Sequence, residues 1–322
     1  MYLLTGANGF IGSVLLGYLN RQGMHDVILV DDFQHYEDKV PNLEGKDFLV
    51  KVERDTLFAI WDQEQWPLRG VFHLGARTDT TETDEALFDR LNLEYSKQIW
   101  TRCARLGIPL VYASSAATYG DGSRGFSDET DPTQLQPLNA YGRSKNDFDA
   151  WALTQTMAPP AWYGLKFFNV YGPNEYHKGR MASVVWHTYR QVLATGKMNL
   201  FRSHRPDYAD GEQSRDFIHV FDLCRVCTYL MESQPDQHGL FNLGTGQARS
   251  FRDLAESTFR AMDRQPDIRF IDTPADLRAN YQYFTEADMQ RLRAAGYAEA
   301  FLTLEAGIDD YVKHYLQPQT YY

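Results

Sequence analysis

The chain has 322 residues, of which 43% are hydrophobic and 23% charged, a balance typical of a folded globular protein. Its 43 acidic and 32 basic residues give a formal net charge of −11, which excludes a general electrostatic attraction to nucleic acid. No apolar run approaches the roughly 18 residues of a membrane span, and the N-terminus lacks the basic region of a signal peptide. We therefore expect a cytoplasmic protein with neither a nucleic acid nor a membrane as its partner.

The first half of the chain alternates short apolar runs with helical patterns. Strands are predicted at 2–5, 26–30, 70–74, 109–114 and 162–168, and helices at 12–22, 84–106 and 141–156. Continuous apolar strands between helices indicate a parallel sheet covered on both faces, which is an α/β fold of the Rossmann-type, doubly wound kind.

The pattern loosens after Pro173, and the polar stretch 202–214 is predicted to be a loop. We predict a dinucleotide-binding domain formed by residues 1–170 together with about 215–245. Residues from about 171–214 and 246–322 are predicted to form a smaller, mixed α/β C-terminal domain that binds the substrate.

The three cysteines are Cys103, Cys224 and Cys227, too few for a disulfide framework. Cys224 and Cys227 have the spacing of a metal or redox pair, but no second Cys or His pair accompanies them. The surrounding residues 220–231 have a helical pattern. We predict that both thiols pack inside a helix and that no metal is bound, with a metal or redox role as the alternative.

A glycine-rich motif, Thr5-Gly-Ala-Asn-Gly-Phe-Ile-Gly12, lies between the first strand and the first helix. This is the context of a dinucleotide-binding loop. Gly6, Gly9 and Gly12 permit a tight turn and let the backbone approach a pyrophosphate, and the helix start offers free N–H groups. The spacing Gly-x-x-Gly-x-x-Gly predicts a nicotinamide dinucleotide site here.

Asp31 ends the second predicted strand, 19 residues after Gly12. A carboxylate at this position can bind ribose hydroxyls, which favours NAD. Lys39 and Lys51 lie downstream and could instead receive a 2′-phosphate, so the residues leave NAD and NADP open. A solvated loop acid is the alternative interpretation of Asp31 and of its neighbour Asp32.

Tyr141 and Lys145 lie four residues apart and so share one face of a predicted helix. An ammonium group and the positive nicotinamide would lower the pKa of the tyrosine, which could then take a proton from an alcohol while hydride leaves. Ser115, at the end of its strand, could hold the substrate oxygen. Alone, the Tyr–Lys pair is more often a surface pair; the glycine loop and the Ser-Ser strand before it favour catalysis.

Two later segments carry further candidates. Lys178, on a glycine-flanked loop after the strand that ends near Asn169, is a candidate second base, although a loop lysine is more often only solvated. Arg215 could clamp a diphosphate with its guanidinium group. A surface ion pair between Arg215 and Asp216 is the alternative.

Together these motifs resemble the extended short-chain dehydrogenases/reductases that act on nucleotide-sugars. The resemblance rests on the glycine loop, Tyr112-Ala-Ser-Ser-Ala-Ala-Thr-Tyr-Gly120, Tyr141-x-x-x-Lys145, Phe168-Asn-Val-Tyr-Gly-Pro173 and Arg215-Asp-Phe217. More closely, the chain is similar to the ADP-L-glycero-D-manno-heptose 6-epimerase family. That similarity rests on His177-Lys-Gly-x-Met-Ala-Ser-Val184, Phe241-Asn-Leu-Gly-Thr-Gly246, Tyr281-Gln-x-Phe-Thr285 and Leu292-Arg-Ala-Ala-Gly-Tyr297, and it extends from Met1 to about Tyr315.

The resemblance implies a reaction for lipopolysaccharide core biosynthesis, in which ADP-D-glycero-β-D-manno-heptose becomes its L-glycero epimer. Tightly bound nicotinamide takes hydride from C6″, leaves a ketone, and returns the hydride to the opposite face. Two acid/base groups are then needed, and the family's pattern assigns them to Tyr141 and Lys178. The resemblance also implies NADP, with NAD possible, and a homo-oligomer, often a pentamer.

The residue roles implied by motif and resemblance fall into two sets. For the cofactor they are Gly6, Gly9, Phe10, Ile11, Gly12, Asp31, Asp32, Lys39, Leu74, Gly75, Ala76, Arg77, Thr78, Asn92, Tyr141, Lys145, Val170 and Lys178. For the substrate they are Ser115, Asn169, Arg180, His187, Phe201, Arg215 and Tyr281. The sequence departs from the family's pattern at Leu74, Arg77 and Arg180, and its loop 202–214 is longer.

Two alternatives stay open. The first is another nucleotide-sugar 4-epimerase or 4,6-dehydratase, which would not need Lys178 as a second base. The second is a non-catalytic, NAD(P)-sensing binding protein, against which the intact set of Ser115, Tyr141 and Lys145 argues.

Overall fold

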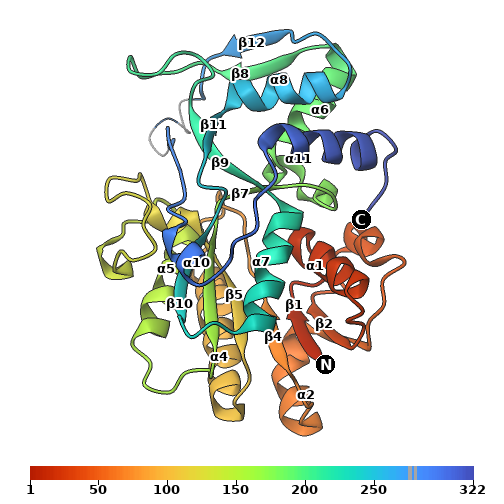
Figure 1. The fold of residues 1–322 in the computed structure, drawn as a ribbon, viewed down its shortest axis with the longest axis vertical. Helices are drawn as coiled ribbons and strands as arrows, with labels where there is room; N and C mark the ends of the chain where they lie inside the picture. The colour runs from red at the N-terminus through yellow and green to blue at the C-terminus, as the bar shows by residue number, and fades with distance from the viewer. Residues whose placement is uncertain (275–277, 279–280) are drawn as a thin grey trace.

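The computed structural model describes residues 1–274, 278 and 281–322 (Figure 1). Within these ranges, seven parallel strands form one sheet in the order β10-β6-β5-β4-β1-β2-β3. In chain order they are β1 (Tyr2–Thr5), β2 (Val27–Asp31), β3 (Val50–Glu53), β4 (Gly70–His73), β5 (Leu110–Ser115), β6 (Trp162–Phe167) and β10 (Gly239–Leu243). On one side of β1 the chain adds β2 and then β3, and on the other side it adds β4, β5, β6 and β10. This arrangement confirms the predicted Rossmann-type, doubly wound fold.

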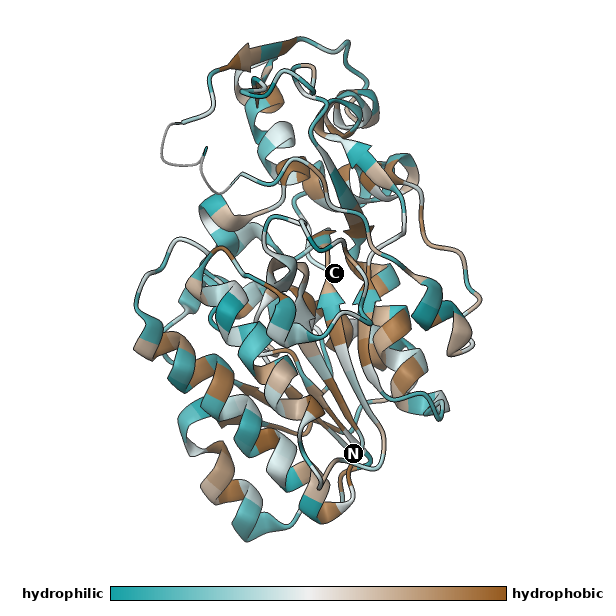
Figure 2. Ribbon diagram, turned by 90° about the vertical axis from the view of Figure 1, so that its left-hand side faces the viewer, coloured by the Kyte–Doolittle hydropathy of each residue, from teal (hydrophilic) through white to brown (hydrophobic). Residues whose placement is uncertain are grey.

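Helices cover both faces of this sheet. One face carries α1 (Phe10–Arg21) and α7 (Val220–Ser233), and the other carries α2 (Leu57–Glu64), α4 (Tyr95–Leu106) and α5 (Ala140–Leu153). Neighbouring residues of β1 belong to opposite cores: Leu4 packs with the first helix layer and Leu3 with the second. Burial on both faces explains the continuous apolar strands, which run between the helix layers in Figure 2.

The long helix predicted at 84–106 consists of three segments. These are α3 (Glu85–Phe88), a π-helical stretch (Asp89–Glu94) and α4. The other predicted strands and helices of the first half are present, with ends shifted by one to three residues, whereas β3 and α2 were not predicted. Cys224 and Cys227 lie in α7 as free thiols with no exposed surface, which confirms that they pack inside a helix.

A second group of elements lies beyond the carboxyl ends of the parallel strands (Figure 1). A three-stranded sheet joins β11 (Ala248–Ser250), β9 (Ser214–His219) and β7 (Asn169–Tyr171), and β12 (Ile268–Ile271) pairs with β8 (Met198–Phe201). A separate apolar core lies among these strands and the helices α6 (Val184–Thr195), α8 (Phe251–Ala261) and α11 (Leu304–Tyr311). The short helix α10 (Gln290–Ala294) packs beside β10 instead. Among the described residues, no helix is long and apolar enough to cross a membrane.

Candidate active site

The glycine loop between β1 and α1 leaves no room for side chains at two positions. A Cβ on Gly6, whose φ is +71°, would lie 2.7 Å from the backbone nitrogen of Gly75. A Cβ on Gly12 would lie 2.1 Å from the carbonyl oxygen of Gly6. Helix α1 begins after Gly9 with no capping side chain, so its first N–H groups remain available to an anion. This geometry fits the pyrophosphate of a dinucleotide.

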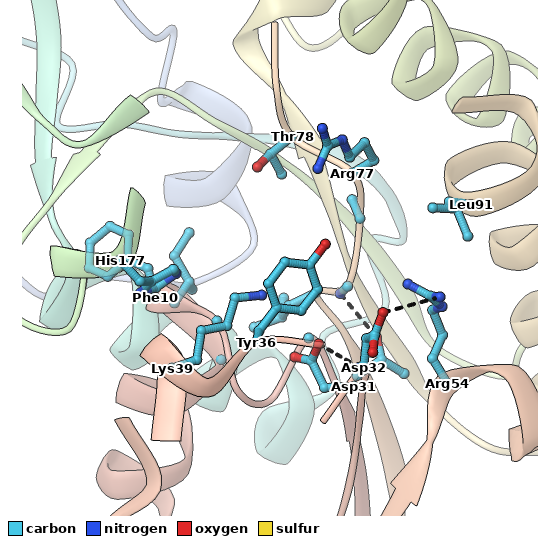
Figure 3. A pocket seen from close by; sticks show the side chains of 18 of the residues that line it. Phe10, Asp31, Asp32, Tyr36, Lys39, Arg54, Arg77, Thr78, Leu91 and His177 are labelled. Carbon is cyan, nitrogen blue, oxygen red and sulfur yellow. Dashed lines mark hydrogen bonds and ion pairs between the residues drawn. The ribbon is translucent and has the colours of Figure 1, made fainter. Parts of the chain in front are cut away.

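A cavity of about 400 Å³ opens along this loop (Figure 3). Most of the residues that the sequence assigns to the cofactor line it: Gly6, Gly9, Phe10, Ile11, Gly12, Asp31, Asp32, Lys39, Leu74, Gly75, Ala76, Arg77, Thr78 and Lys178. They come from the ends of β1, β2 and β4, from the start of α1, and from the 3-10 segments 37–43 and 176–181. Asn92, Tyr141, Lys145 and Val170 are not among its described walls.

Two acidic residues at the end of β2 form one wall. The carboxylate of Asp31 accepts hydrogen bonds from the backbone N–H groups of Asn8 and Asp32, both at 2.8 Å. The carboxylate of Asp32 lies 3.5 Å from the guanidinium of Arg54 and 2.6 Å from Nδ1 of His35. Asp31 is therefore fixed by the backbone, while Asp32 pairs with a cation.

Sequence reasoning missed two lining residues here, Tyr36 and Arg54. Figure 3 shows both beside the acidic pair, with the amine of Lys39 3.8 Å from the centre of the Tyr36 ring. Lys51, the other lysine considered for a 2′-phosphate, does not line the cavity and lies 5.2 Å from the ring of Phe33. Recognising β3 as a strand parallel to β2 would have indicated Arg54.

Asn92 lies in the π-helical stretch and supports the cavity wall from behind. Its amide oxygen accepts from the N–H of Arg77 at 2.8 Å, and its amide nitrogen donates to the carbonyl of Arg77 at 3.0 Å. The same nitrogen donates to the hydroxyl of Ser144 in α5 at 2.9 Å. Asn92 thus connects the loop after β4 to the helix that carries Tyr141.

A buried histidine connects β1 to the same loop. The N–H of Gly75 donates to the hydroxyl of Thr5 at 3.0 Å, and that hydroxyl lies 2.7 Å from Nδ1 of His73. Nε2 of His73 lies 2.9 Å from the hydroxyl of Ser96, which donates to a backbone carbonyl. This bonding pattern places a proton on Nε2, and the Thr5 hydroxyl can donate to Nδ1 of a neutral ring. Burial lowers the pKa of His73 to about 3, so the ring stays neutral.

Tyr141 and Lys145 share one face of α5, which Asn139 caps by accepting from the N–H of Gly142. The ammonium of Lys145 donates to the carbonyl of Ala113 at 2.8 Å, and burial lowers its pKa to about 8. Burial raises the pKa of Tyr141, and the neighbouring Ser115 hydroxyl opposes this only in part. The lowered pKa that the sequence predicts depends on the positive nicotinamide and stays a prediction.

A buried ion pair lies one helical turn below Lys145. The ammonium of Lys166 lies 2.7 Å from the carboxylate of Asp149, and neither side chain has exposed surface. The carboxylate also accepts from the hydroxyls of Ser114 at 2.6 Å and Tyr112 at 3.1 Å. These bonds fix α5 against β5 and β6, and so fix Tyr141 relative to Ser115.

Lys178 lies in a short 3-10 segment (Tyr176–Met181), with Gly179 at a φ of +52° allowing the chain to turn after it. Its ammonium lies 5.3 Å from the centre of the Phe10 ring, and burial lowers its pKa. The guanidinium of Arg180 points elsewhere, toward Thr81 and toward Asp79 at 3.7 Å. His187 lies near this segment, with Nε2 3.3 Å from the carbonyl of Arg180.

Three residues assigned to the substrate meet at the other group of elements. The guanidinium of Arg215 lies 5.6 Å from the ring of Tyr281, which packs against Phe201 at 6.4 Å. Arg215 is buried, which lowers its pKa, and it donates to the carbonyls of Ser214 and Gln282. Asn169 is exposed on β7, apart from these contacts.

Asp216 does not pair with Arg215 at the surface, so that alternative is wrong. Both residues are buried. The carboxylate of Asp216 instead accepts from the backbone N–H groups of Thr245 at 2.7 Å and Gly246 at 2.9 Å. The guanidinium of Arg215 therefore has no acidic partner among the described residues. Its remaining N–H donors are available for an anionic ligand.

Comparison with known proteins places the chain in a family. The model of the NAD dependent epimerase/dehydratase family matches residues 2–244. A protein of Fusobacterium nucleatum named ADP-L-glycero-D-manno-heptose-6-epimerase is 43% identical over 100% of both chains. One of the same name from Nitratidesulfovibrio vulgaris is 47% identical over 98% of both.

Among solved structures, the fold is similar to that of Helicobacter pylori ADP-L-glycero-D-manno-heptose-6-epimerase. The TM-score is 0.79 at 24% identity, covering 97% of this chain and 95% of that one. The protein is therefore an enzyme of an NAD-dependent family that acts on a nucleotide-sugar. The chain belongs to the NAD-dependent epimerase/dehydratase family, in which its full-length relatives are ADP-L-glycero-D-manno-heptose-6-epimerases.

Proposed function

We propose that the protein converts ADP-D-glycero-β-D-manno-heptose to its L-glycero epimer at C6″. The observation that carries this proposal is the position of Lys178. Its block 177–184 carries the resemblance to the 6-epimerases, and its ammonium reaches the dinucleotide cavity over Phe10. A second proton-transferring group beside the cofactor, in addition to Tyr141, is what an epimerase needs to act on both faces of one carbon.

Four residues would carry out the reaction beside the cofactor: Tyr141, Lys178, Ser115 and Lys145. A nicotinamide bound in the cavity would supply the hydride chemistry, both as acceptor and as donor. Tyr141 and Lys178 hold or release a proton at the C6″ oxygen: one takes it as the alcohol becomes a ketone, and the other gives it back after the ketone has turned. Ser115 donates to the same oxygen, and Lys145 positions the cofactor beside α5.

We assign NADP as the cofactor, with NAD as the alternative. The support is a set of cations and an aromatic ring beside the ribose-binding Asp31: Lys39, Arg54 and Tyr36 all line the cavity. A 2′-phosphate there would meet two positive charges and a ring, while Asp31 keeps its carboxylate on backbone N–H groups.

The substrate's diphosphate and base are assigned to the second group of elements. Arg215 would hold the diphosphate, and Phe201 and Tyr281 offer aromatic faces and edges beside it. Asn169 and His187 complete the set by resemblance, and Arg180 is included although it departs from the family's pattern at this position. This proposal treats 171–214 and 246–322 as the substrate-binding domain, 1–170 with about 215–245 as the cofactor domain, and the active form as a homo-oligomer, a pentamer by resemblance.

The experiment is direct. Purified protein carrying its own cofactor is mixed with ADP-D-glycero-β-D-manno-heptose, and the C6″ proton is followed by NMR. We expect conversion to the L-glycero epimer without added nucleotide, and none with UDP-glucose as the control substrate. Lys178→Met should abolish conversion while retaining the cofactor. An unchanged ADP-heptose, or full activity of Lys178→Met, would rule out the two-base epimerase.

A further inference from the structure

A buried carboxylate three residues before Lys178 organises the lysine loop. Glu175 has no exposed surface, and its two oxygens accept from the N–H and the hydroxyl of Ser183, both at 2.6 Å. Ser183 is also the N-cap of α6, where its hydroxyl accepts from the N–H of Trp186 at 3.2 Å. Glu175 therefore joins the two ends of the segment that carries Lys178 and ties them to the start of a helix.

The residue before it secures the other side of this loop. Asn174 is fully buried with a φ of +71°, and its amide nitrogen donates to the hydroxyl of Ser13 in α1 at 3.0 Å. Since α1 begins at the glycine loop, the lysine segment is fixed to the cofactor side through Asn174 and to the substrate side through Glu175.

The charge of Glu175 is close to Lys178 but not bound to it. Among the described residues, the Lys178 ammonium has no carboxylate within 4 Å. Glu175 nevertheless raises the pKa of Lys178, which burial lowers, and Lys178 in turn lowers the pKa of Glu175, which burial raises. A carboxylate that bonds to Ser183 and not to the lysine supports the ammonium while leaving its protons free for a substrate oxygen.

Other groups around this pair do not change charge near neutral pH. Burial lowers the pKa of His177, which also faces Lys39 and Asp38, to about 4. Burial raises the pKa values of Tyr176 and Tyr311, whose hydroxyl faces Glu175. The Phe10 ring covers the ammonium from α1. Glu175 is thus the group whose removal changes the field at Lys178 most.

We propose that Glu175 is a positioning residue for Lys178: it fixes the lysine loop and places one negative charge near, but not on, the ammonium. This inference rests on the proposed role of Lys178 as a proton-transferring group. A buried carboxylate without a bonded cation is costly, and the two hydrogen bonds from Ser183 offset part of that cost.

The central test is Glu175→Gln, which keeps the shape and removes the charge. We expect kcat to fall at least about tenfold, with KM nearly unchanged, and the limb of the kcat–pH profile that belongs to Lys178 to move to lower pH. The direction follows because Glu175 raises the pKa of Lys178. Glu175→Asp retains the charge and should keep the wild-type pH profile at a reduced rate. If Glu175→Gln fails to fold, an altered pH profile in Glu175→Asp would contradict the proposal in its place.

Two further variants isolate the charge. Ser183→Ala removes a hydrogen bond from Glu175 without removing its charge, so the rate should fall without a shift of the profile. Glu305→Gln, on the neighbouring α11 and paired with Arg249, should leave both rate and profile unchanged. A uniform fall in rate at every pH for Glu175→Gln would overturn the proposal, because that result is what loss of folding support alone produces.

A second readout separates this inference from the proposed function. Lysines carrying ¹³C-methyl groups are titrated by NMR, and the Lys178 signal is identified by its absence in Lys178→Met. In Glu175→Gln this signal should titrate at lower pH than in wild type. Suppose that Lys178→Met stayed active while the Lys178 signal still titrated at lower pH in Glu175→Gln. The catalytic role of Lys178 would then be wrong, and the effect of the Glu175 charge on the pKa of Lys178 would be supported. An unmoved signal would overturn the link itself.

Discussion

Arg54 lies 3.5 Å from Asp32 on the wall of the dinucleotide cavity because β2 and β3 pair in parallel with Asp31 opposite Glu53. The residues that follow these two partners in the chain, Asp32 and Arg54, therefore leave the sheet side by side (Figure 3). The carboxylate holds the guanidinium at the edge of the site, where it can meet a phosphate on the ribose.

Arg54→Ala is expected to weaken NADP binding far more than NAD binding. A hydrogen bond to a charged group contributes roughly 1.5–3 kcal/mol, so the dissociation constant for NADP should rise about ten- to a hundredfold. Titration calorimetry on protein stripped of its cofactor measures both constants. Arg269→Ala, an exposed arginine on β12 paired with Asp267, is the control. Equal losses for NAD and NADP would contradict a 2′-phosphate site.

Tyr141→Phe is expected to lower kcat by about two to four orders of magnitude, the usual contribution of a general acid/base. The cofactor should remain bound, since Lys145 is held by the carbonyl of Ala113 and not by the phenol. Turnover is followed by NMR, and bound nicotinamide by its absorbance after denaturation. Tyr315→Phe, a change of the same kind beside the separate apolar core of the second group of elements, should stay fully active. A fully active Tyr141→Phe would show that a group other than Tyr141 transfers the proton.

The parts of this site that sequence predicted are those built by local order along the chain. The glycine loop needs only a strand, a turn and a helix start, all within residues 2–21, and Asp31 follows from the end of the next strand. Fold class followed in the same way from the alternation of apolar strands and helices. These features depend on neighbours in sequence, so pattern alone was enough.

The parts that it missed depend on pairing between distant segments. Arg54 becomes a cavity residue only through the register of β3 against β2, and β3 is too short and polar to be recognised alone. The raised pKa of Tyr141 also depends on contacts between distant segments, because burial of the phenol between α5 and β5 causes it. Glu175 lies two residues before the block 177–184 that carries the resemblance, but its bond to Ser183 requires the fold of the loop.

Arg215→Lys is expected to raise KM for the ADP-sugar at least about tenfold, with a smaller effect on kcat. The planar guanidinium is held by two backbone carbonyls beside Tyr281, so a lysine can replace its charge but not its geometry. Steady-state kinetics separates the two constants. Arg252→Lys, on α8 and paired with Glu212, is the control. A fall in kcat alone would place Arg215 at the reacting carbon and not at the diphosphate.

Asp149→Asn is expected to destabilise the protein by about 3–5 kcal/mol, because it leaves the Lys166 ammonium buried without a counter-charge. Replacing both partners with apolar residues, Asp149→Leu with Lys166→Met, should recover most of that stability. Urea unfolding followed by circular dichroism gives the three free energies. If Asp149→Asn were as stable as the wild type, water or loss of a proton from Lys166 would have to compensate the buried ammonium charge.

The stability of the protein is expected to fall as pH drops from 7 to 5, with His73 as one cause. An unfolded histidine has a pKa of about 6.5, whereas burial lowers that of His73 to about 3. Between these values the unfolded chain binds a proton that the folded ring cannot. The contribution is complete above pH 6.5 and is lost progressively below it, by roughly 2 kcal/mol between pH 7 and 5.

His219 and His177, whose pKa values burial lowers to about 3 and about 4, add similar slopes, so His73→Gln should remove about a third of the histidine contribution. The free energy of unfolding, measured in urea at pH 5, 6, 7 and 8, gives the slope for each variant. His25→Gln, an exposed histidine, should leave the slope as it is. If His73→Gln retained the full slope, the ring would be taking up a proton within the fold. The Thr5 hydroxyl would then accept from Nδ1 instead of donating to it, and nicotinamide release at low pH would show whether this disturbs the loop at Gly75.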